Sequence, residues 1–132
     1  MTNNYHEDAT TLRIATEESY KDGDTIFEEG TSGDWIYIVL SGQVEIYKNI
    51  RNKKVVVDHL KKGDIFGEVS FIDKHPRSAG ARAVGPVVVG VYDRNYLTDQ
   101  YNRMPSDFRN IFEAIARRLR KMTAVATSLA SR

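Results

Sequence analysis

The chain has 132 residues, of which 41% are hydrophobic and 28% charged, an ordinary composition for a globular protein long enough to bury a core. A formal net charge of +1 argues against a protein whose main partner is nucleic acid, and the lack of cysteine excludes disulfides, thiolate metal sites and a cysteine nucleophile. No run is long enough to span a membrane and the first residues are polar, so we expect a cytoplasmic protein with neither a signal peptide nor a membrane contact.

The region from Glu17 to Tyr92 has the pattern of many short β-strands. Segments rich in β-branched and aromatic residues alternate with glycines and polar turn residues. The predicted strands are 25–27, 35–40, 43–47, 54–60, 78–83 and 87–92. Close, regular spacing of this kind is typical of a sandwich or jelly roll rather than of a parallel sheet. The segment before Glu17 has no clear pattern, since Leu12 and Ile14 fit either a strand or one turn of helix.

A weak internal repeat favours a doubly wound roll. The sequence Lys-Asp-Gly-Asp-Thr-Ile-Phe at 21–27 returns as Lys-Lys-Gly-Asp-Ile-Phe at 61–66, forty residues later. In both places a glycine turn precedes an apolar strand. Coincidental turn chemistry remains the alternative interpretation of this repeat.

After Tyr92 the pattern becomes helical. Asp93 is placed to cap a short helix that runs to about Tyr101, and Pro105 with Ser106 begins a longer one. Along the longer helix, apolar residues recur at alternating spacings of four and three: Phe108, Phe112, Ile115, Leu119, Met122, Ala126 and Leu129. This seam either packs wholly on the roll, or packs there with its N-terminal half and pairs with a second copy through its C-terminal half.

The predicted architecture is therefore mainly β, with C-terminal helices. We expect one domain over residues 1–132: a short N-terminal element, a double-stranded β-helix (jelly roll) at about 17–92, and helices at about 93–128. The basic run 117–121 is interpreted as a solvated helix face in preference to a phosphate or membrane contact.

The segment from Phe66 to Ala79 concentrates groups that bind a phosphorylated sugar. A Gly67-Glu68 pair lies nine residues before an Arg77-Ser78 pair, with a loop and a proline between them. A guanidinium favours planar anions such as phosphate, and a fixed carboxylate accepts hydrogen bonds from sugar hydroxyls. The glycine allows a ligand to approach the backbone closely. These residue types together predict a sugar-phosphate pocket.

The same residues resemble the phosphate-binding cassette of cyclic nucleotide-binding domains, the family of the catabolite activator and of protein kinase A regulatory subunits. The Phe-Gly-Glu at 66–68, the Pro-Arg at 76–77 and Ala79 match the family pattern, whereas the family's Leu-Ala-Leu reads Val-Ser-Phe at 69–71. Segments 30–34, 37–39 and 42–44 resemble further signatures of the family. The resemblance runs from about Glu17 to Leu119.

The resemblance implies a regulatory ligand, cAMP first and cGMP second, and no other cofactor. The implied ligand-binding residues are Phe66, Gly67, Glu68, Val69, Ser70, Arg77, Ser78 and Ala79. In this scheme Arg77 and Ser78 hold the phosphate and Glu68 accepts from the ribose 2′-hydroxyl. Phe71 and Ala81 join Val69 and Ala79 as possible purine contacts, and the long helix is a possible lid. Gly30, Gly33 and Gly42 are interpreted as turn glycines rather than ligand contacts.

The predicted function is regulation rather than catalysis. The three histidines are scattered without metal or triad spacing, so we expect no catalytic residue and no metal site. Expected partners are the nucleotide, a second copy through the helix from Phe108 to Leu129, and an unidentified regulated protein. Alternatives are a dimerising adaptor with a degenerate roll, or the sensor fragment of a transcription regulator, since a chain ending at Arg132 leaves no room for a helix-turn-helix.

Overall fold

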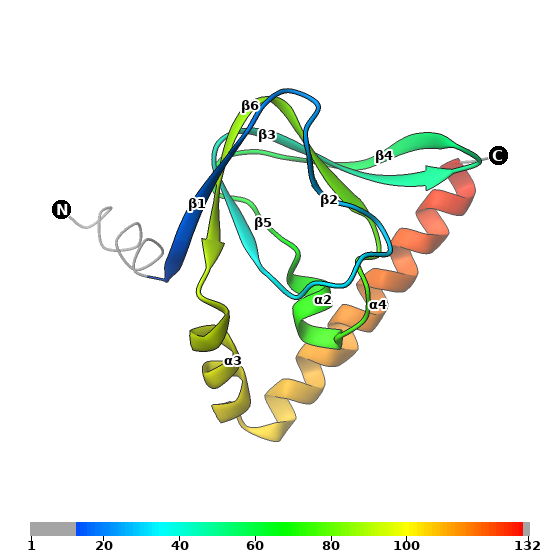
Figure 1. The fold of residues 1–132 in the computed structure, drawn as a ribbon. Coiled ribbons are helices and arrows are strands. Elements are labelled where there is room, and N and C mark those ends of the chain that lie inside the picture. The colour runs from blue at the N-terminus through cyan, green and yellow to red at the C-terminus, as the bar shows by residue number, and fades with distance from the viewer. Residues whose placement is uncertain (1–12, 131–132) are drawn as a thin grey trace.

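The strands of the computed structural model, which describes residues 13–130, form one six-stranded sheet in which every pair is antiparallel (Figure 1). They are β1 Ile14–Tyr20, β2 Thr25–Phe27, β3 Tyr37–Ile50, β4 Lys53–Leu60, β5 Ile65–Phe66 and β6 Gly80–Tyr92. The order is β1-β6-β3-β4, with β2 also paired to β6 and β5 to β3. The mainly β architecture with C-terminal helices is confirmed, and its first strand begins at Ile14 rather than Glu17.

Two long strands at the centre of the sheet correct the sequence prediction. Residues 35–40 and 43–47 are predicted as separate strands, as are 78–83 and 87–92, but the first pair merges into β3, which begins at Tyr37, and the second into β6, which begins at Gly80. Gly42 and Gly85 have positive φ, at 85° and 69°, so the chain bends at each glycine without leaving the sheet. The pairing of β3 with β6 shifts register at this bend, around Ser41.

The internal repeat corresponds to two turns of the same geometry. The backbone N–H of Asp24 donates to Lys21 O at 3.0 Å, and that of Asp64 donates to Lys61 O at 2.9 Å. Each aspartate also accepts from the first residue of its turn through Oδ2, at 2.8 and 2.9 Å respectively. The first turn docks on β6 through Ala83 and the second on β3 through Val39. The repeat is thus structural, and it launches β2 and β5 as predicted.

The core lies inside the roll and is built from alternate residues of its strands. Its buried members are Tyr37, Val39, Val44, Phe66, Ala81, Ala83, Val87, Val89 and Val91. Tyr37 stacks on Phe66 with ring centroids 5.1 Å apart, and Phe27 packs beside both rings. This packing fixes the position of Phe66, and with it the start of the segment that follows β5.

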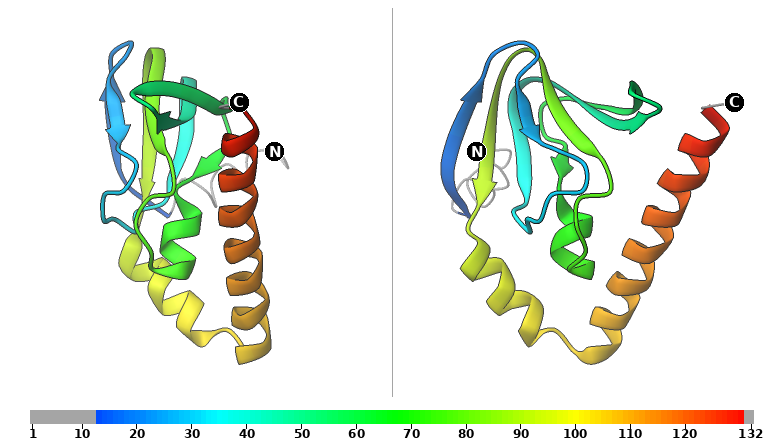
Figure 2. Two further views of the ribbon diagram at one scale, coloured as in Figure 1. Left: turned by 90° about the vertical axis from the view of Figure 1, so that its right-hand side faces the viewer. Right: turned by 45° about the vertical axis from the view of Figure 1, so that its right-hand side comes forward.

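Three helices are described: α2 Glu68–Asp73, α3 Arg94–Arg103 and α4 Ser106–Ala130. Asp93 caps α3 as predicted, accepting from Tyr96 N at 3.1 Å. Helices α3 and α4 make a V below the roll, and α4 passes α2 before it reaches the β3–β4 hairpin (Figures 1 and 2). None of the helices in residues 13–130 combines the length and apolar character needed to cross a membrane.

The apolar seam of α4 does not pack on the roll. Its described members are 41–61% exposed, from Phe108 to Leu129, and Ala126 lies outside the described side chains. The expectation that the N-terminal half of the seam covers the roll is wrong, because Phe108 and Phe112 are exposed. The buried contact is Ala116, a residue outside the seam.

Candidate functional site

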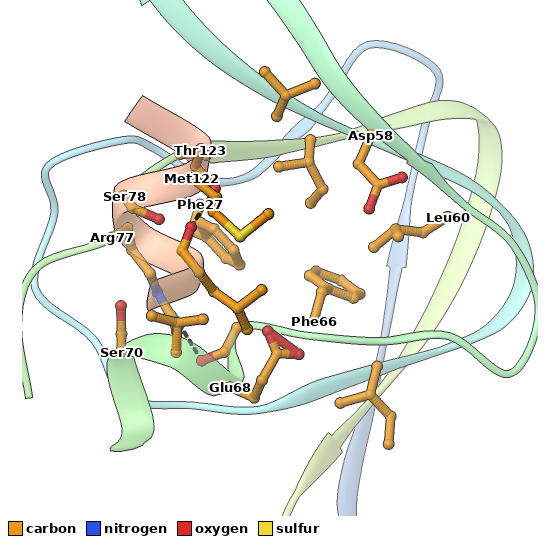
Figure 3. A pocket seen from close by; sticks show the side chains of 17 residues that line it. Phe27, Asp58, Leu60, Phe66, Glu68, Ser70, Arg77, Ser78, Met122 and Thr123 are labelled. Atoms are coloured by element: carbon orange, nitrogen blue, oxygen red, sulfur yellow. Dashed lines mark hydrogen bonds between the residues drawn. The ribbon is translucent and has the colours of Figure 1, made fainter. Parts of the chain in front are cut away.

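A cavity of about 400 Å³ opens between the roll, α2 and α4 (Figure 3). Its size lies in the range of small-molecule sites, which is roughly 300–1,000 Å³. All of the residues predicted to bind a ligand line this one cavity: Phe66, Gly67, Glu68, Val69, Ser70, Arg77, Ser78 and Ala79. The segment from β5 to the start of β6 therefore supplies one wall.

Gly67 is the single residue that connects β5 to α2. It has φ 85°, and a Cβ at this position would lie 2.7 Å from Trp35 O and 3.0 Å from Arg77 Nη1. Only glycine combines this conformation with so close an approach. The residue at once ends the strand, begins α2 and leaves room for the arginine.

Arg77 is buried at the inner end of the cavity, with 4% of its surface exposed. Its Nη1 donates to Gly67 O and its Nη2 to Trp35 O, both at 2.8 Å, and the guanidinium lies 4.3 Å from the Phe27 ring centroid. None of the carboxylates in residues 13–130 forms an ion pair with it. Burial lowers the pKa of Arg77, but the side chain stays protonated at neutral pH. A buried cation without a paired acid is a strong site for an anion.

Glu68 is the first residue of α2 and is partly buried. Burial raises the pKa of its carboxyl above the usual value, while backbone N–H groups and the charge of Arg77 act in the opposite direction. Figure 3 shows this side chain on the cavity wall. A carboxylate at this position can accept a further hydrogen bond from a ligand hydroxyl.

The predicted apolar wall is partly wrong. Phe71 does not line the cavity, since it is buried against Tyr101 with ring centroids 6.0 Å apart. Ala81 is fully buried in the core. Ala81 points into the core by the alternation of β6, and Phe71 lies on the face of α2 that packs on α3, so apolar character was a poor guide to their direction. Val69 and Ala79 do line the cavity.

The far wall comes from predicted strands whose residues were not expected to line the site. Ile46 of β3 and Val57, Asp58 and Leu60 of β4 line the cavity opposite the cassette (Figure 3). Ile46 pairs with Asp58 and Tyr47 with Val56, so Val57 is an extra residue in β4. A bulge of this kind changes which way neighbouring side chains point. It lets both Val57 and Asp58 reach the cavity, and no local sequence signal announces it.

Helix α4 supplies the remaining wall through Leu119, Met122 and Thr123. The resemblance implied that the long helix is a possible lid, without assigning these residues to it. Leu119 and Met122 remain 45% and 59% exposed, so the cavity is open on this side. A bound molecule would cover their apolar surface.

The three glycines interpreted as turn residues divide into two kinds. Gly30 and Gly42 have positive φ and shape turns or bends, as predicted. Gly33 has no such φ, and a Cβ there would lie 3.5 Å from Arg77 Nη2. Gly33 is therefore a neighbour of the guanidinium in addition to a loop residue.

Fold and site together define a ligand-binding β roll bordered by a helix, with a buried guanidinium inside. The chain belongs to the cyclic nucleotide-binding domain family, whose model matches residues 17–104. The resemblance found in the cassette is thereby confirmed.

Similar curated proteins are regulators by name. The CRP-like cAMP-activated global transcriptional regulator of Mycobacterium tuberculosis is 32% identical over 100 residues, which is 75% of this chain and 45% of that protein. The Cyclic AMP receptor protein of Thermus thermophilus is 33% identical over 104 residues, 77% of this chain and 48% of that protein. The chain thus spans less than half the length of these relatives.

Solved structures agree with this assignment. The cAMP-bound form of the EAL enzyme Bd1971 has a TM-score of 0.78 and 26% identity, and the match covers 87% of this chain and 30% of that one. The Catabolite Activator Protein of Thermus thermophilus has a TM-score of 0.70 and 28% identity, covering 96% of this chain and 59% of that one. The shared part is the roll with its following helices.

Proposed function

We propose that this chain is a regulatory module that binds a cyclic nucleotide, cAMP first and cGMP second, and that the ligand changes the position of α4. The observation that carries the proposal is that two groups line the same cavity. One is the buried guanidinium of Arg77, which has no ion pair with a described carboxylate, and the other is the partly buried carboxylate of Glu68. In a cyclic nucleotide the phosphate anion and the free 2′-hydroxyl lie on the same ribose, so one ligand satisfies both groups.

The phosphate would lie against Arg77 and Ser78. Two guanidinium N–H groups are held by carbonyl oxygens and the Tyr37 side chain also interacts with Arg77, so a phosphate would accept from the N–H groups that remain. The carbonyl of Ser78 accepts a hydrogen bond from Lys48 Nζ at 2.9 Å, which fixes the bend before β6 that carries the Ser78 hydroxyl. Glu68 would accept from the 2′-hydroxyl as an ionised carboxylate. Gly67, Val69, Ser70, Ala79 and Phe66 complete this end.

The base would lie toward the far wall, among Ile46, Leu60 and the α4 residues. The names of the relatives mention cAMP, and Bd1971 has been solved with cAMP and with cGMP, which supports this order of preference. Asp58 is the one carboxylate of that wall among the described lining residues. A carboxylate accepts from the amino groups that both purines carry.

Helix movement would occur at the connection between α3 and α4. Helix α3 ends at Arg103 and α4 begins at Ser106, so only Met104 and Pro105 separate them. A ligand that contacts Leu119 and Met122 favours the arrangement in which α4 covers the cavity, in proportion to its difference in affinity between the two arrangements. The purpose of the module is binding and not catalysis, because the polar lining groups are those of a sugar-phosphate site.

Calorimetric titration with cAMP and with cGMP tests the proposal directly. The wild type is expected to bind at least one of them and Arg77→Ala neither, with the melting transition of each protein checked in parallel. Glu68→Gln, which keeps the size of the side chain, serves where Arg77→Ala does not fold. Absence of heat with both nucleotides on the folded wild type would reject the proposal.

The exposed seam of α4 supports a second element of the function, a homodimer through the helix from Phe108 to Leu129. A row of large apolar side chains exposed along one helix is the usual mark of a partner surface. Such a dimer fits both alternatives, an adaptor that binds no nucleotide and the sensor part of a longer transcription regulator. Nucleotide binding separates the first alternative from the main proposal, and the regulated partner is a separate question.

A further inference from the structure

Arg120 of α4 contacts the C-terminal end of α2 and the loop after it through all three nitrogens of its guanidinium. Nε donates to Asp73 Oδ2 at 2.8 Å and Nη2 to Asp73 Oδ1 at 3.0 Å, a two-pronged ion pair. Nη1 donates to Pro76 O at 2.9 Å. The acid and the base lie 47 residues apart in the sequence. This set of contacts, Arg120 with Asp73 and Pro76, is called the latch below.

The latch is shielded from water on its acidic side. The side chain of Asp73 is 5% exposed and that of Arg120 is 26% exposed. Asp73 Oδ1 also accepts from His75 N at 3.0 Å, which fixes the carboxylate in place. Bidentate and largely desolvated pairs of this kind are stronger and more directional than exposed ion pairs.

The latch lies in a part of α4 that is otherwise mostly exposed. Among the α4 side chains whose burial is described, Ala116 alone is buried, at 1% exposure, and it lies one turn before Arg120 on the same side. A methyl group buries little apolar surface, so its contribution to docking is small. The latch adds directional contacts between α4 and the segment of α2.

The latch joins the two parts of the site that close on a ligand. Leu119 and Thr123 flank Arg120 on α4 and line the cavity, while Pro76 directly precedes Arg77. We propose that Arg120 is a positioning residue that locks α4 to the cassette loop and so sets how long a bound nucleotide stays in the cavity. This inference rests on the proposed function and adds the contact by which the helix and the phosphate site are coupled.

The physical consequence is kinetic. A ligand that holds Leu119 and Met122 over itself leaves when α4 moves away from the cavity, and a movement of α4 away from α2 must break the latch. A ligand that fills the cavity in turn holds α4 against α2, because coupling between two sites is reciprocal. The dissociation rate should therefore respond to the latch more strongly than the association rate.

The first measurement is the dissociation rate of a fluorescent cAMP analogue, chased with unlabelled cAMP in stopped flow. Arg120→Ala and Asp73→Ala should each raise this rate by about tenfold or more, since losing one partner of a buried charge pair costs at least that factor. The double variant should be no faster than the faster single variant. Lys121→Ala, which removes an exposed charge from the same turn, is the control and should leave the rate unchanged.

The second measurement is hydrogen exchange of the free protein over residues 114–123. Arg120→Ala should lose protection there relative to Lys121→Ala, with no ligand present. Arg120→Lys, which keeps the charge but cannot form the fork, should lie between wild type and Arg120→Ala in both measurements and covers the case in which the alanine variant does not fold.

The outcomes separate the two proposals. Additive effects of the two alanine variants, or a dissociation rate equal to that of Lys121→Ala, would overturn the latch while cyclic nucleotide binding stands. Failure of the wild type to bind any nucleotide, with exchange still altered by Arg120→Ala, would reject the proposed function and leave the latch as a structural contact without a role in ligand residence.

Discussion

The guanidinium of Arg77 donates a 2.8 Å hydrogen bond to the carbonyl oxygen of Gly67, the residue directly before Glu68. Ten residues separate the two partners, and the bond closes the cassette into a loop around the inner end of the cavity. It also aims the cation at the space that Glu68 borders. The predictions that follow test this loop, its ligand and the helix beside it.

Replacing Arg77 with lysine should weaken cAMP binding by about 100-fold, because one ammonium cannot hold two carbonyl groups and a phosphate in the planar arrangement of a guanidinium. Calorimetry gives the affinity, and Arg117→Lys on the exposed face of α4 is the matched control. Equal affinity of Arg77→Lys and wild type would contradict this use of the guanidinium.

Replacing Glu68 with alanine should remove the preference for a ribose. In the wild type, 2′-deoxy-cAMP should bind about tenfold more weakly than cAMP, the value of roughly one hydrogen bond to a charged group. In Glu68→Ala the two ligands should bind alike. A 2′-hydroxyl effect of the same size in both proteins would show that another residue accepts from the hydroxyl.

Replacing Gly67 with alanine should lower the free energy of unfolding by about 1–3 kcal/mol, since the variant meets both a left-handed backbone and the carbonyl of Trp35. Gly63→Ala is the matched control, because Gly63 has φ 94° and no atom within 4 Å of the added methyl group. Its cost should be about 1 kcal/mol, from the backbone alone. Urea unfolding measures both, and equal losses would mean that the close approach is relieved by a small shift.

The ion pair of Asp73 should make the fold sensitive to acid. Burial disfavours the ionised Asp73, but the hydrogen bonds and charge of Arg120 and the His75 N–H outweigh burial and hold the pKa of the carboxyl below its usual value. The unfolded chain then binds the proton more tightly. The stability that the pair adds is present above the unfolded pKa, about 3.9, and is lost as the pH falls through the folded pKa.

Asp73→Asn should therefore be less stable than wild type at neutral pH and should lose less stability below about pH 4. Urea unfolding across the acid range measures the difference, with Asp107→Asn in the exposed first turn of α4 as the control. Parallel losses in Asp73→Asn and wild type would show that Asp73 does not contribute to the acid sensitivity.

Charging the exposed seam of α4 should dissociate a dimer. Phe112→Glu and Ile115→Glu place a carboxylate on the apolar row, where burial in an interface would be costly. Light scattering should give a dimer for the wild type and a single-chain mass for both variants, and Arg117→Glu should remain dimeric. A wild type that stays monomeric with and without nucleotide would reject the homodimer.

Much of the cassette could be predicted from the sequence because its groups lie within one short run. Gly67, Glu68 and Arg77 can meet across one short loop, and the resemblance to the family cassette indicated that they do. The two Gly-Asp turns and the Asp93 cap were likewise local, each settled by hydrogen bonds that span three residues. The helical period of α4 was equally local and marked its apolar seam.

The rest depended on contacts between distant segments. Gly42 and Gly85 were expected to separate strands. They bend β3 and β6 instead, because these two strands pair with each other along their length. The bulge that brings Val57 and Asp58 to the cavity exists only through the pairing of β3 with β4. Phe71 is buried because α2 packs against Tyr101 of α3. The exposure of the seam follows from where α4 docks. Only the folded chain brings Arg120 to Asp73, because no local pattern specifies a partner 47 residues away.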